Sequence, residues 1–363
     1  MKTFFKNRAL ALFNTLTLLA ALSSAKSFAA VVIQYHHVSE QTPKITSITP
    51  KLFSEQIELL IKDNFEFLNA AQFASLNNQY DLDHTQKKQI LVTFDDGYES
   101  VLSNAAPILN AHNIPFVVFI NPSLLGKNGY LSLSQLRDLQ NQGAIIANHT
   151  MTHPHLIRSL DGENQQQWQK RVTKEITEAQ EFIEKNFDKT ASFFAYPYGE
   201  FNSALKKILK EKGLIGFSQH SGAVGADSDW QALPRFAFGG DYGQIDTFAD
   251  KVNSLPLPLE SISIYGETGA HLLDPLLPHT SSTPIVKLKS SHSIQLSCYA
   301  SGQGKINVTK QSDQSLVVQA NSPLPIGRSR YNCTAPSDIT GRYYWVSFPF
   351  YRKNENGSWY LEY

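Results

Sequence analysis

The chain has 363 residues, of which 42% are apolar, and its 32 basic side chains balance its 32 acidic ones. This apolar fraction suffices for a packed core and excludes a largely disordered chain. A protein that binds nucleic acid by neutralising phosphates carries an excess of Lys and Arg, so the zero formal charge argues against a nucleic-acid partner. The length predicts two domains, or one large domain with an appendage.

Residues 1–29 have the pattern of an export signal. Lys2, Lys6 and Arg8 precede a mostly apolar stretch over residues 9–22, and the small residues that follow would allow cleavage after Ala29. The apolar stretch is too short to span about 30 Å of hydrocarbon, which makes a membrane anchor the weaker alternative. We therefore expect an exported protein, periplasmic or secreted, whose mature chain has no membrane span.

Between residues 30 and 255, short apolar runs alternate with helical patterns. Continuous apolar runs are typical of parallel strands that are buried on both faces. Apolar residues at helical spacing lie between them, for example Leu205, Ile208 and Leu209 ahead of Gly213. About seven repeats of strand and helix predict an α/β fold with a parallel, barrel-like sheet. The predicted strands are residues 31–36, 90–95, 116–120, 144–148, 191–196, 215–219 and 233–238.

The rest of the chain has a different texture. Residues 256–284 are rich in proline and predict a linker. Residues 285–363 alternate apolar and polar positions between turn residues, which predicts a smaller all-β sandwich domain. Its two cysteines, Cys298 and Cys333, are expected to form a disulfide in an oxidising compartment. The strands predicted here are residues 291–299, 305–309, 315–320, 329–334 and 342–351.

Two polar clusters directly follow apolar strands, at the end where sites assemble in parallel sheets. The first contains Asp95 and Asp96, adjacent carboxylates whose repulsion must be relieved by a cation or a shared proton. The second contains His149 and His153, whose spacing of four is common among metal ligands. One Asp and two His make a metal-binding set with open positions, and the second Asp is free to act as a base.

Residues 93–97 (Thr-Phe-Asp-Asp-Gly), followed by His149 and His153, resemble the first two motifs of the polysaccharide deacetylase family, the NodB-homology domain of carbohydrate esterase family four. The resemblance covers roughly residues 31–240. It implies a distorted (β/α)7 barrel, with Asp95 as general base and Asp96, His149 and His153 as ligands of a divalent metal. Zinc is usual in this family, and Co²⁺, Ni²⁺ and Fe²⁺ are alternatives.

Two further segments resemble family motifs. Residues 196–199 (Tyr-Pro-Tyr-Gly) are similar to the third motif, which implies that the backbone N–H of Tyr198 helps to hold the oxyanion. Arg235 is the candidate for the arginine that orients Asp95. The residues around Trp230 resemble the fourth motif more loosely, and Trp230 is either a wall of the substrate groove or a core residue.

The general acid of the family, a His in a Leu-x-His motif after the last barrel strand, has no clear counterpart. His279 has the matching neighbours but lies in the proline-rich segment. Residues 35–37 (Tyr-His-His) resemble the arrangement in the branch that deacetylates poly-β-1,6-N-acetylglucosamine, so His36 is the favoured acid and His279 the alternative. Because side chains alternate along a strand, only one of His36 and His37 is expected to enter the site.

These motifs predict a metal-dependent hydrolase that removes N-acetyl groups from an extracellular N-acetylglucosamine polymer, poly-β-1,6-linked or chitin-like. Asp95 would take a proton from water and His36 would protonate the leaving amine. The alternatives are an O-acetyl polysaccharide esterase and a non-catalytic carbohydrate-binding protein on a deacetylase scaffold. Aromatic residues near the C-terminus, such as Trp345 and Trp359, would serve sugar binding in the last case, although core packing explains them as well.

Overall fold

Apolar runs from residue 28 to residue 237 form one parallel sheet in the computed structural model, which describes residues 28–78, 84–278 and 281–361. The strand order is β10-β1-β5-β6-β7-β8-β9, with the short β4 beside β5. The strands are β1 (Phe28–Tyr35), β4 (Glu66–Phe67), β5 (His84–Phe94), β6 (Phe116–Ile120), β7 (Ala144–Asn148), β8 (Thr190–Ala195), β9 (Ile215–Phe217) and β10 (Phe236–Ala237). Strands β1 and β6 are buried along their whole length, as continuous apolar sequences require.

This sheet curls until its two edges meet. Phe236 of β10 pairs with Ile33 of β1, and Leu233 forms a parallel bridge with Phe217 of β9. The segment 233–237 therefore connects one edge strand to the other. The predicted fold class, a distorted seven-stranded barrel followed by β structure, is confirmed.

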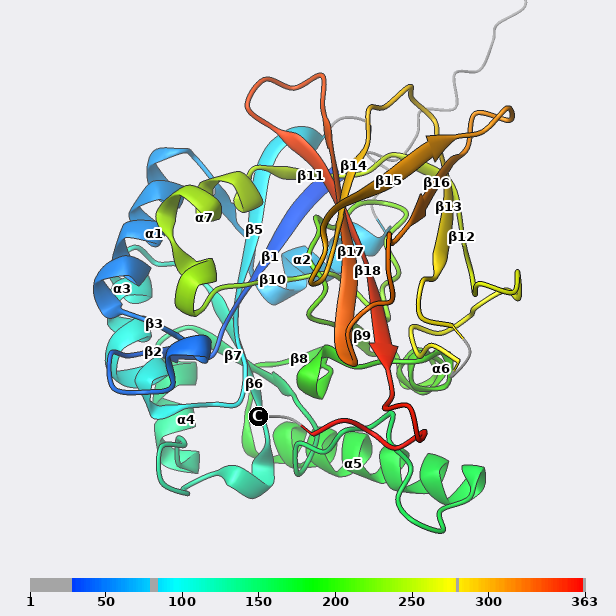
Figure 1. The fold of residues 1–363 in the computed structure, drawn as a ribbon. Coiled ribbons are helices and arrows are strands. Elements are labelled where there is room, and N and C mark those ends of the chain that lie inside the picture. Colours follow the sequence, from blue (N-terminus) through cyan, green and yellow to red (C-terminus); the bar gives the residue numbers. More distant parts are fainter. Residues whose placement is uncertain (1–27, 79–83, 279–280, 362–363) are drawn as a thin grey trace, which may run out of the picture.

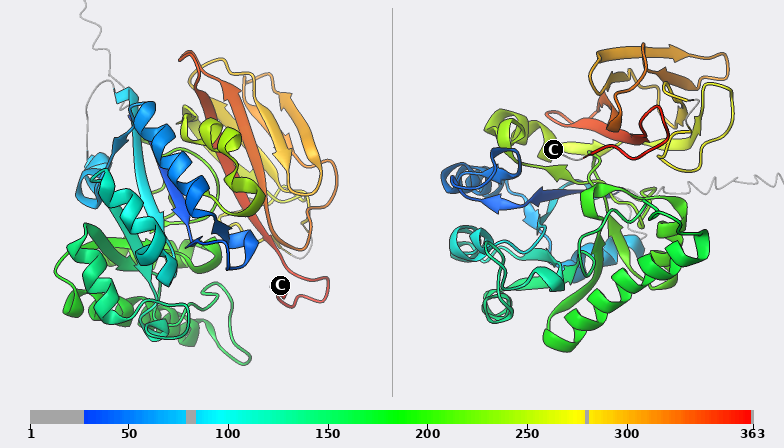
Figure 2. Two further views of the ribbon diagram at one scale, coloured as in Figure 1. Left: turned by 90° about the vertical axis from the view of Figure 1, so that its left-hand side faces the viewer. Right: turned by 60° about the horizontal axis from the view of Figure 1, so that its bottom comes forward.

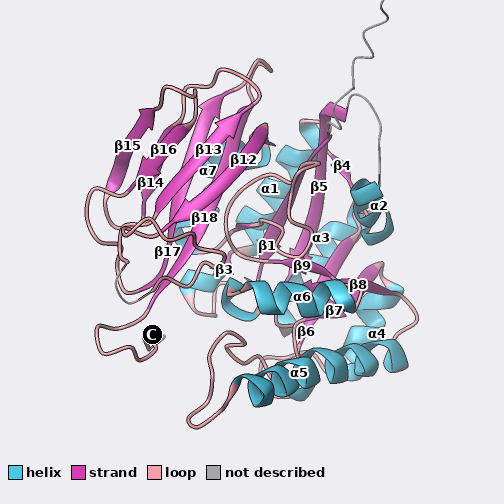
Figure 3. Cartoon of the chain, turned by 90° about the vertical axis from the view of Figure 1, so that its right-hand side faces the viewer, coloured by secondary structure: helices cyan, strands magenta, loops and turns pink. Residues whose placement is uncertain are grey.

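Helices cover the outside of this sheet (Figures 1 and 3). In α5, the Asn164 side chain caps the first turn by accepting from the Gln167 N–H at 2.9 Å, and Val172, Ile176 and Ile183 form a buried face. The helices are α1 (Pro50–Lys62), α2 (Ala70–Ser75), α3 (Ala106–Ala111), α4 (Leu133–Asn141), α5 (Gln165–Asn186), α6 (Ser203–Glu211) and α7 (Ile245–Val252). Short elements between them are β2 (His37–Val38), β3 (Ser47–Ile48), the π-helical turn η3 (Val101–Ala105) and the 3₁₀ turns η1 (Lys44–Thr46), η2 (Leu76–Asn78), η4 (Pro122–Leu124), η5 (Pro197–Gly199) and η6 (Gly240–Gly243).

The second sheet has the order β11-β18-β17-β14-β15-β16-β13-β12. It folds over a core that contains the expected disulfide between Cys298 and Cys333. The Tyr331 hydroxyl crosses this core, donating to the Pro284 carbonyl at 2.9 Å and accepting from the Ala320 N–H at 3.0 Å. The strands are β11 (Ser254–Pro256), β12 (Leu259–Tyr265), β13 (Ile285–Ser290), β14 (Ser297–Ala300), β15 (Gly304–Lys310), β16 (Leu316–Gln319), β17 (Gly327–Pro336) and β18 (Tyr343–Arg352).

The segment 256–284 differs from its prediction as a linker. It contains β12, whose residues Leu259–Tyr265 pair antiparallel with β13. The prolines of this segment lie outside the part of β12 that pairs with β13. The alternation of apolar and polar residues over Ser261–Tyr265 is short, so among many turn residues it indicates a strand only weakly. We call residues 28–253 the barrel and residues 254–361 the β-domain.

The β-domain packs along one side of the barrel (Figure 2). The Trp345 ring of β18 lies edge-on to Phe236 of β10, with the ring centres 5.2 Å apart. The buried Arg342 guanidinium donates to the backbone carbonyls of Asn253 and Lys87 at 3.2 and 3.4 Å. Apolar burial and charge-assisted hydrogen bonds therefore hold the two parts together.

Most of the predicted export signal lies outside the described residues, and β1 begins at Phe28, within its last two positions. Among the helices of the described chain, none combines the length and the apolarity that crossing a membrane requires.

Candidate metal centre and active site

The polar clusters predicted for the site follow strands that end at the same rim of the barrel. Asp95 and Asp96 come after β5, and His149 comes after β7. The backbone joins the neighbouring strand ends: the Asp95 N–H donates to the Tyr35 carbonyl at 2.9 Å, and the His149 N–H donates to the Ile120 carbonyl at 3.0 Å. Residues far apart in the sequence therefore meet at this rim, as in other parallel barrels.

Asp96, His149 and His153 converge on one point. The Nε2 atoms of His149 and His153 lie 3.3 and 3.4 Å from Oδ1 of Asp96, and the ligand atoms all lie within 4.8 Å of one another. The other ring nitrogen of His149, Nδ1, is 2.8 Å from the Ala195 carbonyl. A carbonyl accepts only from a protonated nitrogen, so Nε2 keeps its lone pair for a metal. The cluster fits a divalent metal that takes nitrogen and oxygen ligands.

The protonation of these side chains depends on burial and on their shared charges. Burial lowers the pKa of His153 to about 4, with a contribution from His149, so this imidazole is neutral at neutral pH. Burial also lowers the pKa of His149, but its hydrogen bond to Asp96 and the charges of Asp95 and Asp96 outweigh burial and raise it. Because metal ligands must be deprotonated, the raised pKa of His149 sets protons in competition with a metal at this ring.

Unusual backbone conformations concentrate at this rim. Asp96, Thr150, His153 and Tyr198 have φ angles of 71°, 71°, 61° and 59°, and they are four of the seven described non-glycine residues with positive φ. Such conformations cost about 1–3 kcal/mol each and persist where the surroundings impose them. Here the His153 N–H donates to the Thr150 hydroxyl at 3.0 Å, and the Thr150 N–H donates to the Asn148 side chain at 2.8 Å. This concentration supports a functional role for the rim.

Asp95 lies beside the cluster and is fully buried. The Arg235 guanidinium donates to both of its carboxylate oxygens at 2.7 and 2.8 Å. Gln34 Nε2 donates to Oδ2 at 2.6 Å. Burial raises the pKa of Asp95, but the charge and hydrogen bonds of Arg235 outweigh it and lower the pKa below its usual range. Asp95 is therefore an oriented, ionised carboxylate. The sequence analysis missed Gln34, although a polar residue inside the apolar strand β1 is a signal that could have identified it.

The structure brings both His36 and His37 towards the centre. The charge of His36 lowers the pKa of Asp95 and of Asp96, so its ring lies within electrostatic reach of both carboxylates. His37 stacks on Tyr98 with the ring centres 3.7 Å apart, and burial lowers its pKa to about 4 although Asp96 acts to raise it. Strand β1 ends at Tyr35, before either histidine, so alternation along that strand does not decide which of the two enters the site. His279 lies outside the described residues.

Comparison with known proteins identifies the fold that carries this centre. Residues 83–216, which contain Asp95, Asp96 and both metal-ligand candidates of the second cluster, match the family model described as polysaccharide deacetylase. This part of the chain is a polysaccharide deacetylase domain.

Relatives and solved structures agree with this assignment. The poly-β-1,6-N-acetyl-D-glucosamine N-deacetylase of Staphylococcus epidermidis is 25% identical over 236 residues, which are 58% of this chain and 80% of the relative. Its counterpart in Staphylococcus aureus is 26% identical over 240 residues, with 60% and 81% covered. The Streptococcus pyogenes deacetylase PplD shares the fold at 18% identity with a TM-score of 0.54, over 62% of this chain and 98% of its own. IcaB from Ammonifex degensii shares the fold at 21% identity with a TM-score of 0.52, over 60% of this chain and 95% of its own.

Of the two remaining candidates in the barrel, one lies at the centre and one does not. The Tyr198 ring packs edge-on against His153 at 4.7 Å, and its face stacks on His155 at 3.6 Å. Trp230 instead lies in the hydrophobic core, 7% exposed, with its ring 5.7 Å from that of Phe73. The structure therefore favours the core interpretation of Trp230 over the groove wall.

The sequence analysis also missed Glu200, which directly follows the third motif. Its carboxylate is fully buried and accepts from His155 Nδ1 at 2.9 Å and from the Tyr360 hydroxyl at 2.6 Å. Arg158 donates to it at 3.2 Å, and the Arg328 guanidinium lies 3.7 Å away. Because Tyr360 and Arg328 belong to the β-domain, that domain reaches the edge of the deacetylase site.

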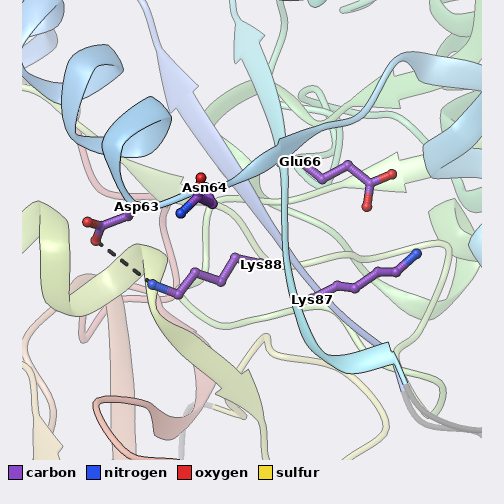
Figure 4. A pocket seen from close by; sticks show the side chains of 5 residues that line it. All are labelled: Asp63, Asn64, Glu66, Lys87 and Lys88. Carbon is purple, nitrogen blue, oxygen red and sulfur yellow. Dashed lines mark ion pairs between the residues drawn. The ribbon is translucent and has the colours of Figure 1, made fainter.

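The barrel also has a hollow away from the metal-ligand cluster, and Figure 4 shows the side chains that line it. It is lined by charged and polar side chains, including Lys87 and Lys88, and Lys88 pairs with Asp63 at 3.9 Å. Lys88 lies in β5 seven residues before Asp95, which directly follows that strand, or about 23 Å away at the rise of an extended strand. The hollow therefore belongs to the opposite end of the barrel from the deacetylase centre.

Proposed function

We propose that this protein is a metal-dependent polysaccharide deacetylase that removes N-acetyl groups from an extracellular N-acetylglucosamine polymer. The observation that carries the proposal is the convergence of Asp96, His149 and His153 beside a separately oriented carboxylate, Asp95. The β-1,6-linked polymer is the favoured substrate because the relatives from both staphylococci are named for it. The resemblance of residues 35–37 to that branch points to the same polymer.

In this proposal, Asp96, His149 and His153 hold the metal. When bound, it supplies Lewis acidity, which polarises the acetyl carbonyl and lowers the pKa of water. Zinc is the favoured metal because two imidazoles and a carboxylate suit it, and Co²⁺, Ni²⁺ and Fe²⁺ share enough of its ligand preference to substitute.

The residues of the chain carry the proton transfers. Asp95, ionised and fixed by Arg235, takes the proton of the attacking water. The backbone N–H of Tyr198 stabilises the oxyanion of the tetrahedral intermediate. An amine leaves poorly until it is protonated, so His36 delivers a proton to the amide nitrogen.

We also infer that the protein is exported and that its deacetylase domain spans about residues 30–255. The disulfide between Cys298 and Cys333 supports export, because disulfides persist in oxidising compartments. The partner is then an acetylated aminosugar polysaccharide outside the cytoplasm.

Acetate release tests the proposal. The purified protein is stripped with a chelator, reloaded with Zn²⁺, Co²⁺ or Ni²⁺, and supplied in turn with β-1,6-linked and β-1,4-linked N-acetylglucosamine oligomers and acetylated xylan. We expect metal-dependent release from the β-1,6-linked oligomers above all. Release from acetylated xylan alone would indicate an esterase, and a metal-loaded protein that binds the oligomers without releasing acetate would indicate a non-catalytic binding protein.

A further inference from the structure

A pocket with a cavity volume of about 80 Å³ lies between the deacetylase domain and the β-domain. The lining comes from both sides: Tyr198, Ser218 and His220 from the barrel, and Arg328, Arg330 and Tyr351 from the β-domain. We call it the interdomain pocket.

The interdomain pocket begins at the proposed catalytic centre. Tyr198 belongs to both, because its ring contacts His153 at 4.7 Å and also lines the pocket. The Arg328 guanidinium carbon lies 5.5 Å from the centre of the same ring. The side of the centre next to Tyr198 therefore opens towards Arg328 and the β-domain.

The walls of the pocket are held in place by buried polar contacts. The Tyr351 hydroxyl donates to the Gly199 carbonyl at 3.1 Å and accepts from the Phe201 N–H at 3.3 Å, which joins β18 to the loop that carries Tyr198. Glu200, in the same loop, lies 3.7 Å from Arg328. The pocket is therefore formed before substrate binds, which lowers the entropy cost of binding.

The chemistry of the lining suits an uncharged sugar. Arg328 and Arg330 are two residues apart on β17, so they share the face of the strand that looks towards the barrel. Guanidinium groups donate hydrogen bonds to the hydroxyl and acetamido oxygens of a sugar, and aromatic rings pack against its carbon face. The same guanidinium groups repel a glucosamine unit that has already lost its acetyl group and become an ammonium ion.

We propose that the interdomain pocket binds the N-acetylated sugar unit next to the one that is deacetylated, so that the β-domain supplies a substrate subsite. This inference rests on the proposed function. Arg330 is the residue to change, because it lines the pocket and its side-chain contact is with the Ser221 hydroxyl at 3.3 Å, outside the Glu200 cluster. Lys310, an exposed cation on β15, is the matched control.

The test compares KM for a fully acetylated β-1,6-linked pentamer and for the monosaccharide N-acetylglucosamine, which has no neighbouring unit, with the zinc-loaded wild type, Arg330→Ala and Lys310→Ala. We expect Arg330→Ala to raise KM about tenfold for the pentamer, the scale of one lost hydrogen bond from a charged donor. The rise should be less than twofold for the monosaccharide, and Lys310→Ala should behave as wild type. Equal effects of Arg330→Ala on both substrates, or no effect on either, would overturn the subsite.

Binding of the pentamer, measured by calorimetry, separates this inference from the proposed function. If the wild type released no acetate at all, the proposed function would fail, and a tenfold weaker affinity in Arg330→Ala would still support the pocket as a sugar site. Unchanged affinity in Arg330→Ala would exclude it, whatever the activity. A pentamer with internal glucosamine units should bind more weakly than the acetylated one, and tighter binding would contradict the charge argument.

Discussion

At the scale of single residues, Asp95 and Asp96 have different partners although they are adjacent in the chain. Asp96 faces the imidazoles of His149 and His153, whereas both oxygens of Asp95 accept from Arg235. The left-handed backbone of Asp96, with φ of 71°, separates the two side chains. In the proposed mechanism, position in the rim rather than residue type therefore gives one carboxylate to the metal and the other to proton transfer.

This division of roles predicts opposite results for two isosteric changes. Asp96→Asn should lose zinc, because it removes the charged ligand that both imidazoles face. Asp95→Asn should keep zinc and lose about 10²- to 10⁴-fold in kcat, the usual contribution of a general base. Zinc content by elemental analysis, together with kcat on the acetylated oligomer, checks both. The reverse pattern would exchange the two roles.

Two substrates with different leaving groups test whether His36 is the general acid. His36→Ala should lower kcat on the amide substrate by about 10²-fold or more, because the amine must be protonated to leave. The loss should be much smaller on 4-nitrophenyl acetate, whose phenolate leaves without a proton. His37→Ala is the matched control, and the same selective loss in that variant would transfer the role to His37.

At the scale of elements, a disulfide joins two strands of the β-domain. Cys298 of β14 and Cys333 of β17 are paired residues on neighbouring strands, and both are fully buried. The link closes a loop with a sequence separation of 35. Closing such a loop restricts the unfolded chain more than the folded one.

Removing the disulfide should therefore destabilise the protein. In the chain-entropy model, the double change Cys298→Ala and Cys333→Ala lowers the free energy of unfolding by about 3–4 kcal/mol. Denaturant unfolding with and without a reducing agent measures this effect, because the reductant should bring wild type close to the variant and leave the variant unchanged. A variant as stable as the oxidised wild type would show that the disulfide adds no stability.

At the scale of the whole molecule, the β-domain is fixed to the barrel by a few buried contacts. The Arg342 guanidinium donates to the carbonyls of Asn253 and Ser254, each at 3.2 Å, and to that of Lys87 at 3.4 Å. A charged donor that satisfies several buried carbonyls contributes more than an exposed ion pair. We therefore expect the two parts to unfold together.

Changing Arg342 should weaken this coupling. Arg342→Met keeps the apolar stem and removes the donors, and should lower the free energy of unfolding by about 2 kcal/mol or more. Calorimetry should then show a broader or divided transition. Arg137→Met is the control and should change little, because Arg137 is exposed and its guanidinium donates to the Asn186 carbonyl at 3.4 Å. A single sharp transition at the wild-type temperature in Arg342→Met would contradict the role of this side chain.

The strands of the barrel and the positions of Asp95, Asp96, His149 and His153 could be predicted from the chain, because both depend on patterns within a few residues. Strand bounds at residues 116–120 and 144–148 agree with β6 and β7, where apolar runs are sharply bounded. The β12 strand was missed because proline-rich surroundings obscure a short alternation.

Other groups that support the centre became visible only once the chain was folded. Gln34 meets Asp95 across 61 residues of sequence, and Tyr360 meets Glu200 across 160. Arg235 meets Asp95 across 140 residues and was anticipated from the family resemblance, not from any local pattern. Local periodicity carries no information about such contacts, because they form only when the sheet closes and the β-domain packs on it. The candidate ligands could therefore be predicted from the chain, whereas Gln34 and Glu200 were found only in the closed fold.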